Sequence, residues 1–262
     1  MSELSKNYLD RFGGLGRLYG KEALPKLHAA HVMVIGIGGV GSWTAESLAR
    51  NGVGKITLVD MDALCITNTN RQLPAIDGNI GREKASVMAD RLKRINPECE
   101  VIADIDFFSD STADRLLGQN PDCIVDAIDS VRHKCLLISQ CRDRGIPLVV
   151  TGGAGGKVDP TCVASDDLAF ATNDRLLKLV RKRLRQHYDF PPEPTKLPFN
   201  IVSVYSTENA RYPWADGTVC EMPEPGSFAK MDCESGFGSA SQVTGTFGFA
   251  TAGEAVKIVI QN

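Results

Sequence analysis

The stretch HVMVIGIGGVGSWTAESLARNGVGKITLVD, residues 31–60, decides the fold of this 262-residue chain. It begins with a short apolar run, His31–Ile35, passes through a glycine-rich loop into a segment with helical spacing, and ends in a second apolar run, Lys55–Asp60. A strand, a glycine-rich turn, a helix and another strand in this order are typical of a parallel βαβ unit. The sequence therefore predicts a nucleotide-binding fold here.

Short apolar runs alternate with helical patterns up to residue 151. The further strands expected are Glu100–Ala103, Cys123–Ile128 and Pro147–Thr151, and the expected helices are Val40–Asn51, Arg82–Arg94, Ser111–Leu117 and Val131–Arg144. Such alternation favours parallel strands joined by right-handed crossovers. We expect an α/β fold with a Rossmann-like, doubly wound and mostly parallel sheet.

The pattern changes after residue 151, where four glycines form a junction. Beyond it we expect a helix at Asp174–His187, a proline-rich linker at Phe190–Pro198 and a strand at Asn200–Ser206. A long loop, Trp214–Ser241, and a terminal helix from about Thr244 complete the chain. The chain then divides into an N-terminal helical arm (1–30), a nucleotide-binding core (31–157) and a C-terminal extension (158–262). We expect the extension to pack on the same sheet, on the substrate side.

Composition and the chain ends favour a cytoplasmic protein. The net charge is −3, which excludes a polycation of the histone kind, and the first residues lack the apolar core of a secretory signal. None of the eight cysteines forms a C-x-x-C pair, which is typical of reduced thiols and not of a zinc site. The apolar stretch from Val243 to Ile260 contains Glu254 and Lys257, so we expect no membrane contact.

The glycine-rich loop carries the first functional prediction. Its residues Gly36, Gly38, Gly39 and Gly41 permit a tight turn and a close approach to phosphate, and the helix that follows offers unpaired N–H groups. Asp60 ends the next strand, where a carboxylate accepts hydrogen bonds from ribose hydroxyls. A purely structural turn is the alternative.

Three charged residues further along favour a triphosphate over a dinucleotide. Arg71 and Lys84 are suited to hold extra phosphate charge, and Asp129, at the end of a strand, to hold Mg²⁺. In the alternative interpretation, Arg71 and Lys84 are solvated surface charges and Asp129 caps the helix that begins at Val131.

With these motifs the chain resembles the superfamily of ubiquitin-activating-enzyme-like adenylating proteins, which includes the molybdopterin and thiamine sulfur-carrier adenylyltransferases. The strings that carry the resemblance are GIGGVG (36–41), LVDMD (58–62), NTNRQ (68–72), GREK (81–84), RINP (94–97) and DAIDS (126–130). The resemblance implies ATP binding, with Asp60 on the ribose and Asp129 as the metal-binding acid. It places these residues around the nucleotide and its phosphates: Asp62, Asn68, Arg71, Gln72 and Lys84. It also implies an N-terminal arginine that reaches the partner's site in a homodimer, with Arg11 as the candidate and Arg17 in reserve.

Within that superfamily the chain is most similar to the tRNA threonylcarbamoyladenosine dehydratase family. Sulfur-carrier adenylyltransferases usually have two C-x-x-C pairs, which are missing here. The strings that support this branch are RFGGLGRLYG (11–20), VTGGAGGKVDPT (150–161), YSTE (205–208), DGTVC (216–220) and MDCESGFGSAS (231–241). The resemblance implies that ATP activates the carboxylate of threonylcarbamoyladenosine beside the tRNA anticodon as an acyl adenylate. Loss of the activated oxygen then gives a cyclic product.

The segment 175–185, RLLKLVRKRLR, contains six basic residues and no acidic one. Its apolar residues have helical spacing, which leaves Lys178, Arg181, Lys182 and Arg185 largely outward and suited to contact tRNA phosphates. A solvated helix face is the alternative.

The cysteines suggest a further partner. Because related proteins act with cysteine desulfurase systems, Cys233, or else Cys220, is a candidate acceptor of persulfide sulfur. We expect Cys123 and Cys135 to be small buried side chains.

Two other functions remain open at this point. The same fold could adenylate the C-terminus of a ubiquitin-like sulfur-carrier protein, although the missing C-x-x-C pairs and the basic helix disfavour this. An NAD-dependent oxidoreductase would use the same glycine loop but would not need Arg71, Lys84 and Asp129.

Overall fold

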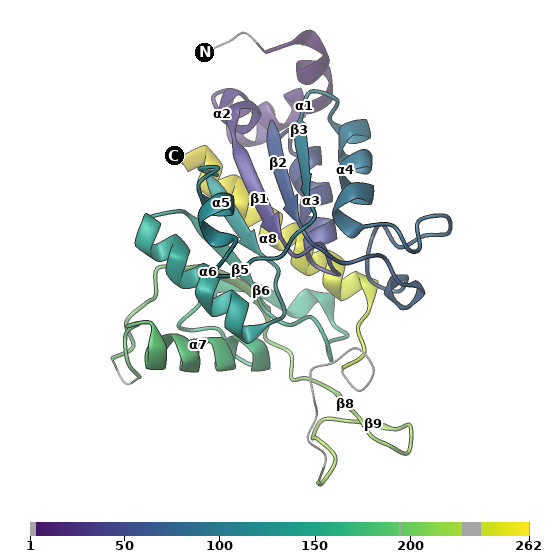
Figure 1. Ribbon diagram of the computed structural model, residues 1–262, viewed down its shortest axis with the longest axis vertical. Coiled ribbons are helices and arrows are strands. Elements are labelled where there is room, and N and C mark those ends of the chain that lie inside the picture. The colour runs from purple at the N-terminus through teal and green to yellow at the C-terminus, as the bar shows by residue number, and fades with distance from the viewer. Residues whose placement is uncertain (1–3, 194, 227–236, 262) are drawn as a thin grey trace.

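The computed structural model describes residues 4–193, 195–226 and 237–261. Its centre is a seven-stranded sheet of order β3-β2-β1-β4-β5-β7-β6, which is parallel except for the edge strand β6 (Figure 1). The strands are β1 His31–Ile35, β2 Lys55–Val59, β3 Glu100–Asp104, β4 Cys123–Asp126, β5 Leu148–Thr151, β6 Val163–Asp167 and β7 Val202–Ser206. The predicted α/β fold with a mostly parallel sheet is confirmed.

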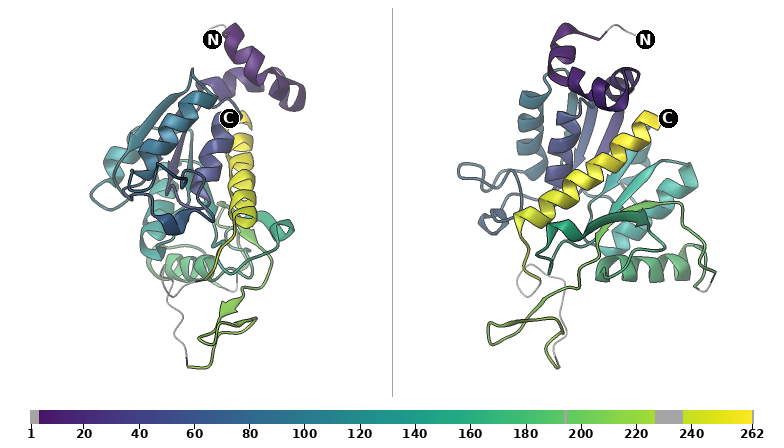
Figure 2. Two further views of the ribbon diagram at one scale, coloured as in Figure 1. Left: turned by 90° about the vertical axis from the view of Figure 1, so that its right-hand side faces the viewer. Right: turned by 180° about the vertical axis from the view of Figure 1, so that it is seen from behind.

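Helices cover both faces of this sheet (Figures 1 and 2). Alternate residues of each strand face opposite cores: Val32 and Val34 pack with α3, α4 and α8, whereas Met33 and Ile35 pack with α5, α6 and α7. The helices are α1 Lys6–Tyr19, α2 Ala23–Ala29, α3 Gly41–Arg50, α4 Lys84–Ile95, α5 Ala113–Leu117, α6 Val131–Arg144, α7 Arg175–His187 and α8 Ser241–Gln261. Two short 3₁₀ turns, Ile66–Asn68 and Pro160–Cys162, lie between them.

The C-terminal part contains strands that the sequence did not predict. Strand β6 pairs only with β7, and because it lies at the sheet edge it lacks the apolar run of a central strand. A small ribbon, β8 Tyr212–Pro213 and β9 Val219–Cys220, overlaps the predicted long loop and projects from the sheet at the bottom of Figure 1. Helix α8 begins at Ser241, one turn before the predicted start. The strand expected over Cys123–Ile128 ends at Asp126.

Helix α8 is, among the described residues, the one helix long and apolar enough to cross a membrane. Of its most apolar window, 56% is buried inside the protein. Val243, Phe247 and Val256 are fully or almost fully covered, and Figure 2 shows α8 lying across the face that also carries α3. One face of α8 therefore packs in the protein core, whereas Phe249 on the helix is half exposed.

A fully buried ion pair closes the carboxyl end of β4. Lys134 on α6 lies 2.8 Å from the Asp126 carboxylate, and both side chains are inaccessible to solvent. The Lys134 ammonium also donates to the Asp126 carbonyl at 3.2 Å, and that carbonyl accepts a second bond from the Thr151 hydroxyl. Burial raises the pKa of the Asp126 carboxyl, whereas the Lys134 ammonium lowers it. The pair thus ties together β4, β5 and the start of α6.

Replacing one partner should destabilise the protein strongly, because it leaves a buried charge without its counterion. We expect Lys134→Met to lower the free energy of unfolding by about 3–5 kcal/mol. The double variant Lys134→Met/Asp126→Asn should recover part of this loss, since it buries no charge. The matched control is Lys257→Met, which breaks the exposed pair with Glu254 and should cost less than about 1 kcal/mol. Urea unfolding measures all three, and equal losses for Lys134→Met and Lys257→Met would contradict the prediction.

Candidate nucleotide-binding site

The glycine loop lies between β1 and α3, at the carboxyl edge of the parallel strands. Gly36 has a φ of +93°, and a Cβ there would lie 2.7 Å from the carbonyl oxygen of Ala127. A Cβ at Gly41 would collide with the backbone of Gly36. Val40 at the N-cap of α3 has no polar side-chain atom, so the loop and helix start present backbone N–H groups, as an anion site requires.

Asp60 fastens this loop from the end of β2. Its carboxylate accepts the Ile37 N–H at 2.6 Å and the Asp62 N–H at 2.8 Å. Burial raises the pKa of the Asp60 carboxyl, while Lys84 and the two backbone donors lower it. The predicted ribose ligand therefore also holds the glycine loop in place.

Asp62 and Lys84 form an ion pair at the two ends of the crossover from β2 to α4. The Lys84 ammonium lies 2.7 Å from the Asp62 carboxylate, and its side chain is only 10% exposed. The description of Lys84 as a solvated surface charge is therefore wrong. Since the Asp62 N–H donates to the Asp60 carboxylate, this ion pair places Lys84 at the same edge of the sheet.

Asn68, Arg71 and Gln72 lie in the same crossover, and the side chains of Arg71 and Gln72 lie beside the glycine loop. Asn68 is buried and accepts the Cys65 N–H at 3.0 Å. Gln72 Nε2 would lie 3.9 Å from a Cβ at Gly38, and Arg71 Cγ 3.5 Å from one at Gly39. The Gln72 Oε1 atom is buried and has no hydrogen-bond partner among the described residues. An unpartnered buried amide beside a glycine loop is suited to a ligand that supplies the missing donor.

Asp129 follows β4 and is exposed at the same edge. Ser130, and not Asp129, is the N-cap residue of α6, and it makes no side-chain capping bond. The alternative interpretation of Asp129 as a helix cap is therefore wrong. Since Ala127 touches Gly36, the loop that carries Asp129 lies against the glycine loop.

Arg11 and Arg17 lie on α1, at the opposite end of α3 from the glycine loop. Tyr8 on the same helix donates to the Gly52 carbonyl just beyond α3, and the Arg11 guanidinium donates to the Ile95 carbonyl. The ten residues of α3 separate the two ends by about 15 Å. Neither arginine is therefore part of the nucleotide site of its own chain.

The basic segment 175–185 forms α7, and its apolar face is buried as predicted by Leu176, Leu177, Val180 and Leu184. Lys178 and Lys182 are exposed, and Arg181 is half-buried. Arg185 differs from the predicted outward orientation. Its side chain is 18% exposed, pairs with Glu193 at 3.0 Å and lies over the Phe199 ring. Besides Arg185 and Glu193, a groove on this face is lined by Lys178, Leu179, Arg181, Lys182 and Gln186.

The cysteines within the described residues differ in their exposure to solvent. Cys123 and Cys135 are buried as predicted, and burial raises the pKa of both thiols to about 12. Cys220 is partly exposed on β9, and Cys233 lies outside the described residues. No group of three or more potential metal ligands of the His, Cys, Asp and Glu types occurs in the part of the chain that the structure describes.

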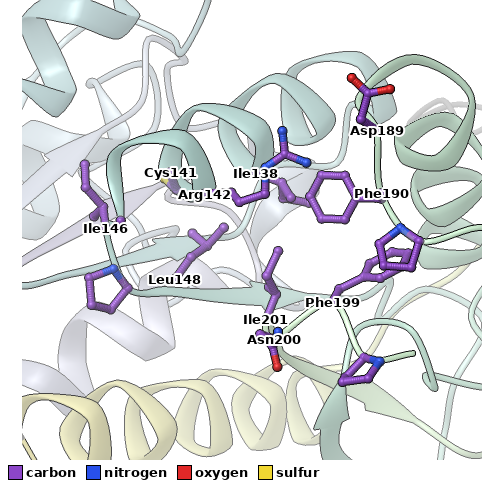
Figure 3. Close-up of a pocket in the computed structure, with 14 residues that line it drawn as sticks. Ile138, Cys141, Arg142, Ile146, Leu148, Asp189, Phe190, Phe199, Asn200 and Ile201 are labelled. Atoms are coloured by element: carbon purple, nitrogen blue, oxygen red, sulfur yellow. The ribbon is translucent and has the colours of Figure 1, made fainter. Parts of the chain in front are cut away.

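A separate cavity of about 480 Å³ lies at the amino end of the strands (Figure 3). Leu148 at the start of β5 and Phe199 and Ile201 before β7 are among the residues that line it, and the Arg142 guanidinium carbon lies 4.5 Å from the centre of the Phe190 ring. Because ligands of open parallel sheets bind at the carboxyl ends of the strands, this cavity is on the wrong edge for the nucleotide.

Comparisons with known proteins agree with this geometry. Residues 14–262 match the ThiF family. The tRNA threonylcarbamoyladenosine dehydratase of Escherichia coli K12 is 48% identical over 255 residues, which are 97% of this chain and 95% of that protein. Among solved structures, TcdA (CsdL) superposes with a TM-score of 0.91 at 45% identity, over 100% of this chain and 98% of the other.

A solved structure also shows a relative with the nucleotide bound. The E. coli tRNA N6-threonylcarbamoyladenosine dehydratase TcdA in complex with ATP has a TM-score of 0.86 and 42% identity, covering 99% of this chain and 98% of that chain. The chain therefore belongs to the ThiF family, in the branch of the tRNA threonylcarbamoyladenosine dehydratases.

Proposed function

We propose that this chain catalyses the ATP-dependent dehydration of threonylcarbamoyladenosine next to the tRNA anticodon, through an adenylated carboxylate. The observation that carries the proposal is the full-length similarity to tRNA threonylcarbamoyladenosine dehydratases, one of which has been solved in complex with ATP. In this chain the side chains of Arg71 and Gln72 lie beside the glycine loop. Cytoplasmic action follows from the tRNA substrate.

The first step turns a carboxylate into an electrophile. A carboxylate oxygen of the substrate attacks the α-phosphorus of ATP, the bond to the β-phosphate oxygen breaks, and pyrophosphate leaves. In the second step the carbamoyl nitrogen attacks the activated carbonyl carbon, loses its proton, and AMP leaves with the former carboxylate oxygen. Because nucleophile and electrophile belong to one molecule, correct positioning lowers this barrier greatly.

The protein's contribution to the first step is electrostatic. The N–H groups of the glycine loop and the guanidinium of Arg71 would stabilise negative charge on the phosphates, and Asp60 would hold the ribose. Lys84 would reach the phosphates from its pair with Asp62.

Mg²⁺ fits the donor set at this edge of the sheet. Protein magnesium sites use one or two carboxylates together with substrate phosphates, and Asp129 is an exposed carboxylate beside the glycine loop. When bound, the ion would neutralise phosphate charge. We assign its protein ligand to Asp129.

A homodimer would complete the site. Arg11 lies beyond the far end of α3, whose ten residues span about 15 Å, so it would reach ATP only in a partner's site. Arg17, on the last turn of α1, is the reserve candidate. Transfer of persulfide sulfur to Cys220 or Cys233 by a cysteine desulfurase stays a separate prediction.

The direct test follows the modified nucleoside. Incubation of the protein with Mg-ATP and tRNA that carries threonylcarbamoyladenosine should remove one water, detected by mass spectrometry of the nucleosides. Arg71→Lys and Asp129→Ala should each lower the rate about a hundredfold or more while the protein remains folded, because each removes charge stabilisation at the phosphates. The matched controls are Arg82→Lys and Asp110→Ala, two exposed residues paired with Asp90 and Arg132. Adenylation of a sulfur-carrier protein, with no change in the tRNA, would contradict the proposal and support the second function.

The dimer proposal predicts complementation between inactive variants. Arg11→Ala and Asp129→Ala should each be inactive alone. In a freely exchanging mixture of equal amounts, one site of each mixed dimer contains both intact residues, so about a quarter of the wild-type activity should return. If Arg11→Ala keeps full activity, Arg11 is not the residue that acts in the partner's site. An equal mixture of Arg17→Ala and Asp129→Ala would then test Arg17 in the same way.

The basic face of α7 predicts a salt-dependent tRNA contact. The double variant Lys178→Glu/Lys182→Glu should weaken tRNA binding without changing ATP binding. If each lysine neutralises one phosphate, the slope of log affinity against log salt should fall by about 2. The control Lys93→Glu/Arg94→Glu makes the same charge change on exposed residues of α4. Equal losses in both double variants would indicate a general charge effect and exclude a specific contact on α7.

A further inference from the structure

The backbone carbonyl of Arg71 is a junction between three segments that are distant in sequence. The indole N–H of Trp43, on α3, donates to it at 3.1 Å. The hydroxyl of Thr244, on α8, lies 3.3 Å from the same oxygen and shares its proton with the carbonyls of Ala240 and Ser241 in its own helix. One acceptor therefore links the crossover to α3 and α8.

This junction lies directly over the glycine loop. A Cβ at Gly39 would lie 3.2 Å from the Thr244 methyl group and 3.5 Å from Arg71 Cγ. Gly39 is thus covered by the side chains of both residues. The neighbouring Asn70 is also tied to the C-terminal segment, since its amide donates to the Ser239 carbonyl at 2.7 Å.

The close approach of α8 depends on a glycine at the helix contact. A Cβ at Gly248 would lie 2.5 Å from Trp43 Cβ and 2.8 Å from the Val40 carbonyl oxygen. The Trp43 ring also packs against Phe249, with their centroids 5.9 Å apart. Trp43 of α3 therefore packs against α8, and its indole N–H donates to the Arg71 carbonyl.

Among the described residues, the Arg71 guanidinium hydrogen-bonds only within its own crossover. It donates to the Thr67 carbonyl at 2.7 Å and to the Asn70 amide oxygen at 3.0 Å. The position of this guanidinium relative to the glycine loop therefore depends on what holds the crossover backbone. Trp43 and Thr244 supply that attachment at the residue itself.

We propose that Trp43 and Thr244 are positioning residues, which act through the Arg71 carbonyl to hold the Arg71 side chain beside the glycine loop. The inference rests on the proposed role of Arg71. Charge stabilisation in a transition state requires donors held close to their productive positions, so a loosened crossover lowers the rate of adenylation.

The test uses changes that remove a donor and preserve shape. Trp43→Phe and Thr244→Val should each lower kcat for tRNA dehydration, by about tenfold for Trp43→Phe and less for Thr244→Val, whose bond is shared. The KM for ATP should rise by a smaller factor, and Thr244→Ser should restore the rate. The matched controls are Thr251→Val, which removes a buried hydroxyl bonded to the Phe247 carbonyl within α8, and Trp214→Phe, which removes the indole that donates to the Met222 carbonyl.

A double-mutant cycle separates positioning from general stabilisation. If Trp43 acts through Arg71, then Trp43→Phe should have little further effect on kcat in an Arg71→Lys background. Additive losses of kcat in the double variant would overturn the inference, and so would an unchanged kcat in both Trp43→Phe and Thr244→Val. In either case, a strong loss of activity in Arg71→Lys alone would still support the proposed function. If Arg71→Lys keeps full activity, the phosphate role of Arg71 fails and the positioning inference fails with it. If Trp43→Phe does not fold, the same double-mutant cycle can be measured with Thr244→Val and Arg71→Lys.

Discussion

The close contact between the backbones of Gly36 and Ala127 is the constraint on which the rest of the structure depends. It brings the end of β1 against the end of β4 with no side chain between them, since a Cβ at Gly36 would lie 2.7 Å from the Ala127 carbonyl oxygen. The contact turns the chain sharply into α3 and places the loop of Asp129 beside the glycine loop. Any larger residue at position 36 would separate the two halves of the site.

Buried polar groups then hold the loops around this contact. Asp60 fastens the glycine loop through the Ile37 N–H, and Lys134 fastens the end of β4 through Asp126. Buried charges cost desolvation energy, and each is offset here by an opposite charge or by several hydrogen bonds. The rigid edge that results presents Arg71 and Gln72 from the crossover and Asp129 from the loop after β4, an arrangement suited to the proposed phosphate site.

Much of the site could be predicted from the sequence because it depends on local features. The glycine loop, Asp60 and the alternation of strands and helices follow from backbone freedom and hydrophobic period, which neighbouring residues determine. Strand β6 was not predicted because an edge strand needs no apolar run. The roles of Trp43 and Lys134 were not predicted because neither residue belongs to a recognisable motif. The sequence of the predicted helix does not indicate that Lys134 will be fully buried, since its burial requires the carboxylate of Asp126, which lies on β4.

The sequence by itself determined the order of strand, phosphate loop, helix and acidic strand end, and it supplied the charged residues of the crossover. Only the tertiary structure decided what those charges touch. Lys84 pairs with Asp62, Arg185 turns onto Phe199, and Thr244 reaches a carbonyl 173 positions away. The physical reason is that each contact joins segments that meet only when the whole fold packs; the Thr244 contact, for example, forms because α8 packs on α3.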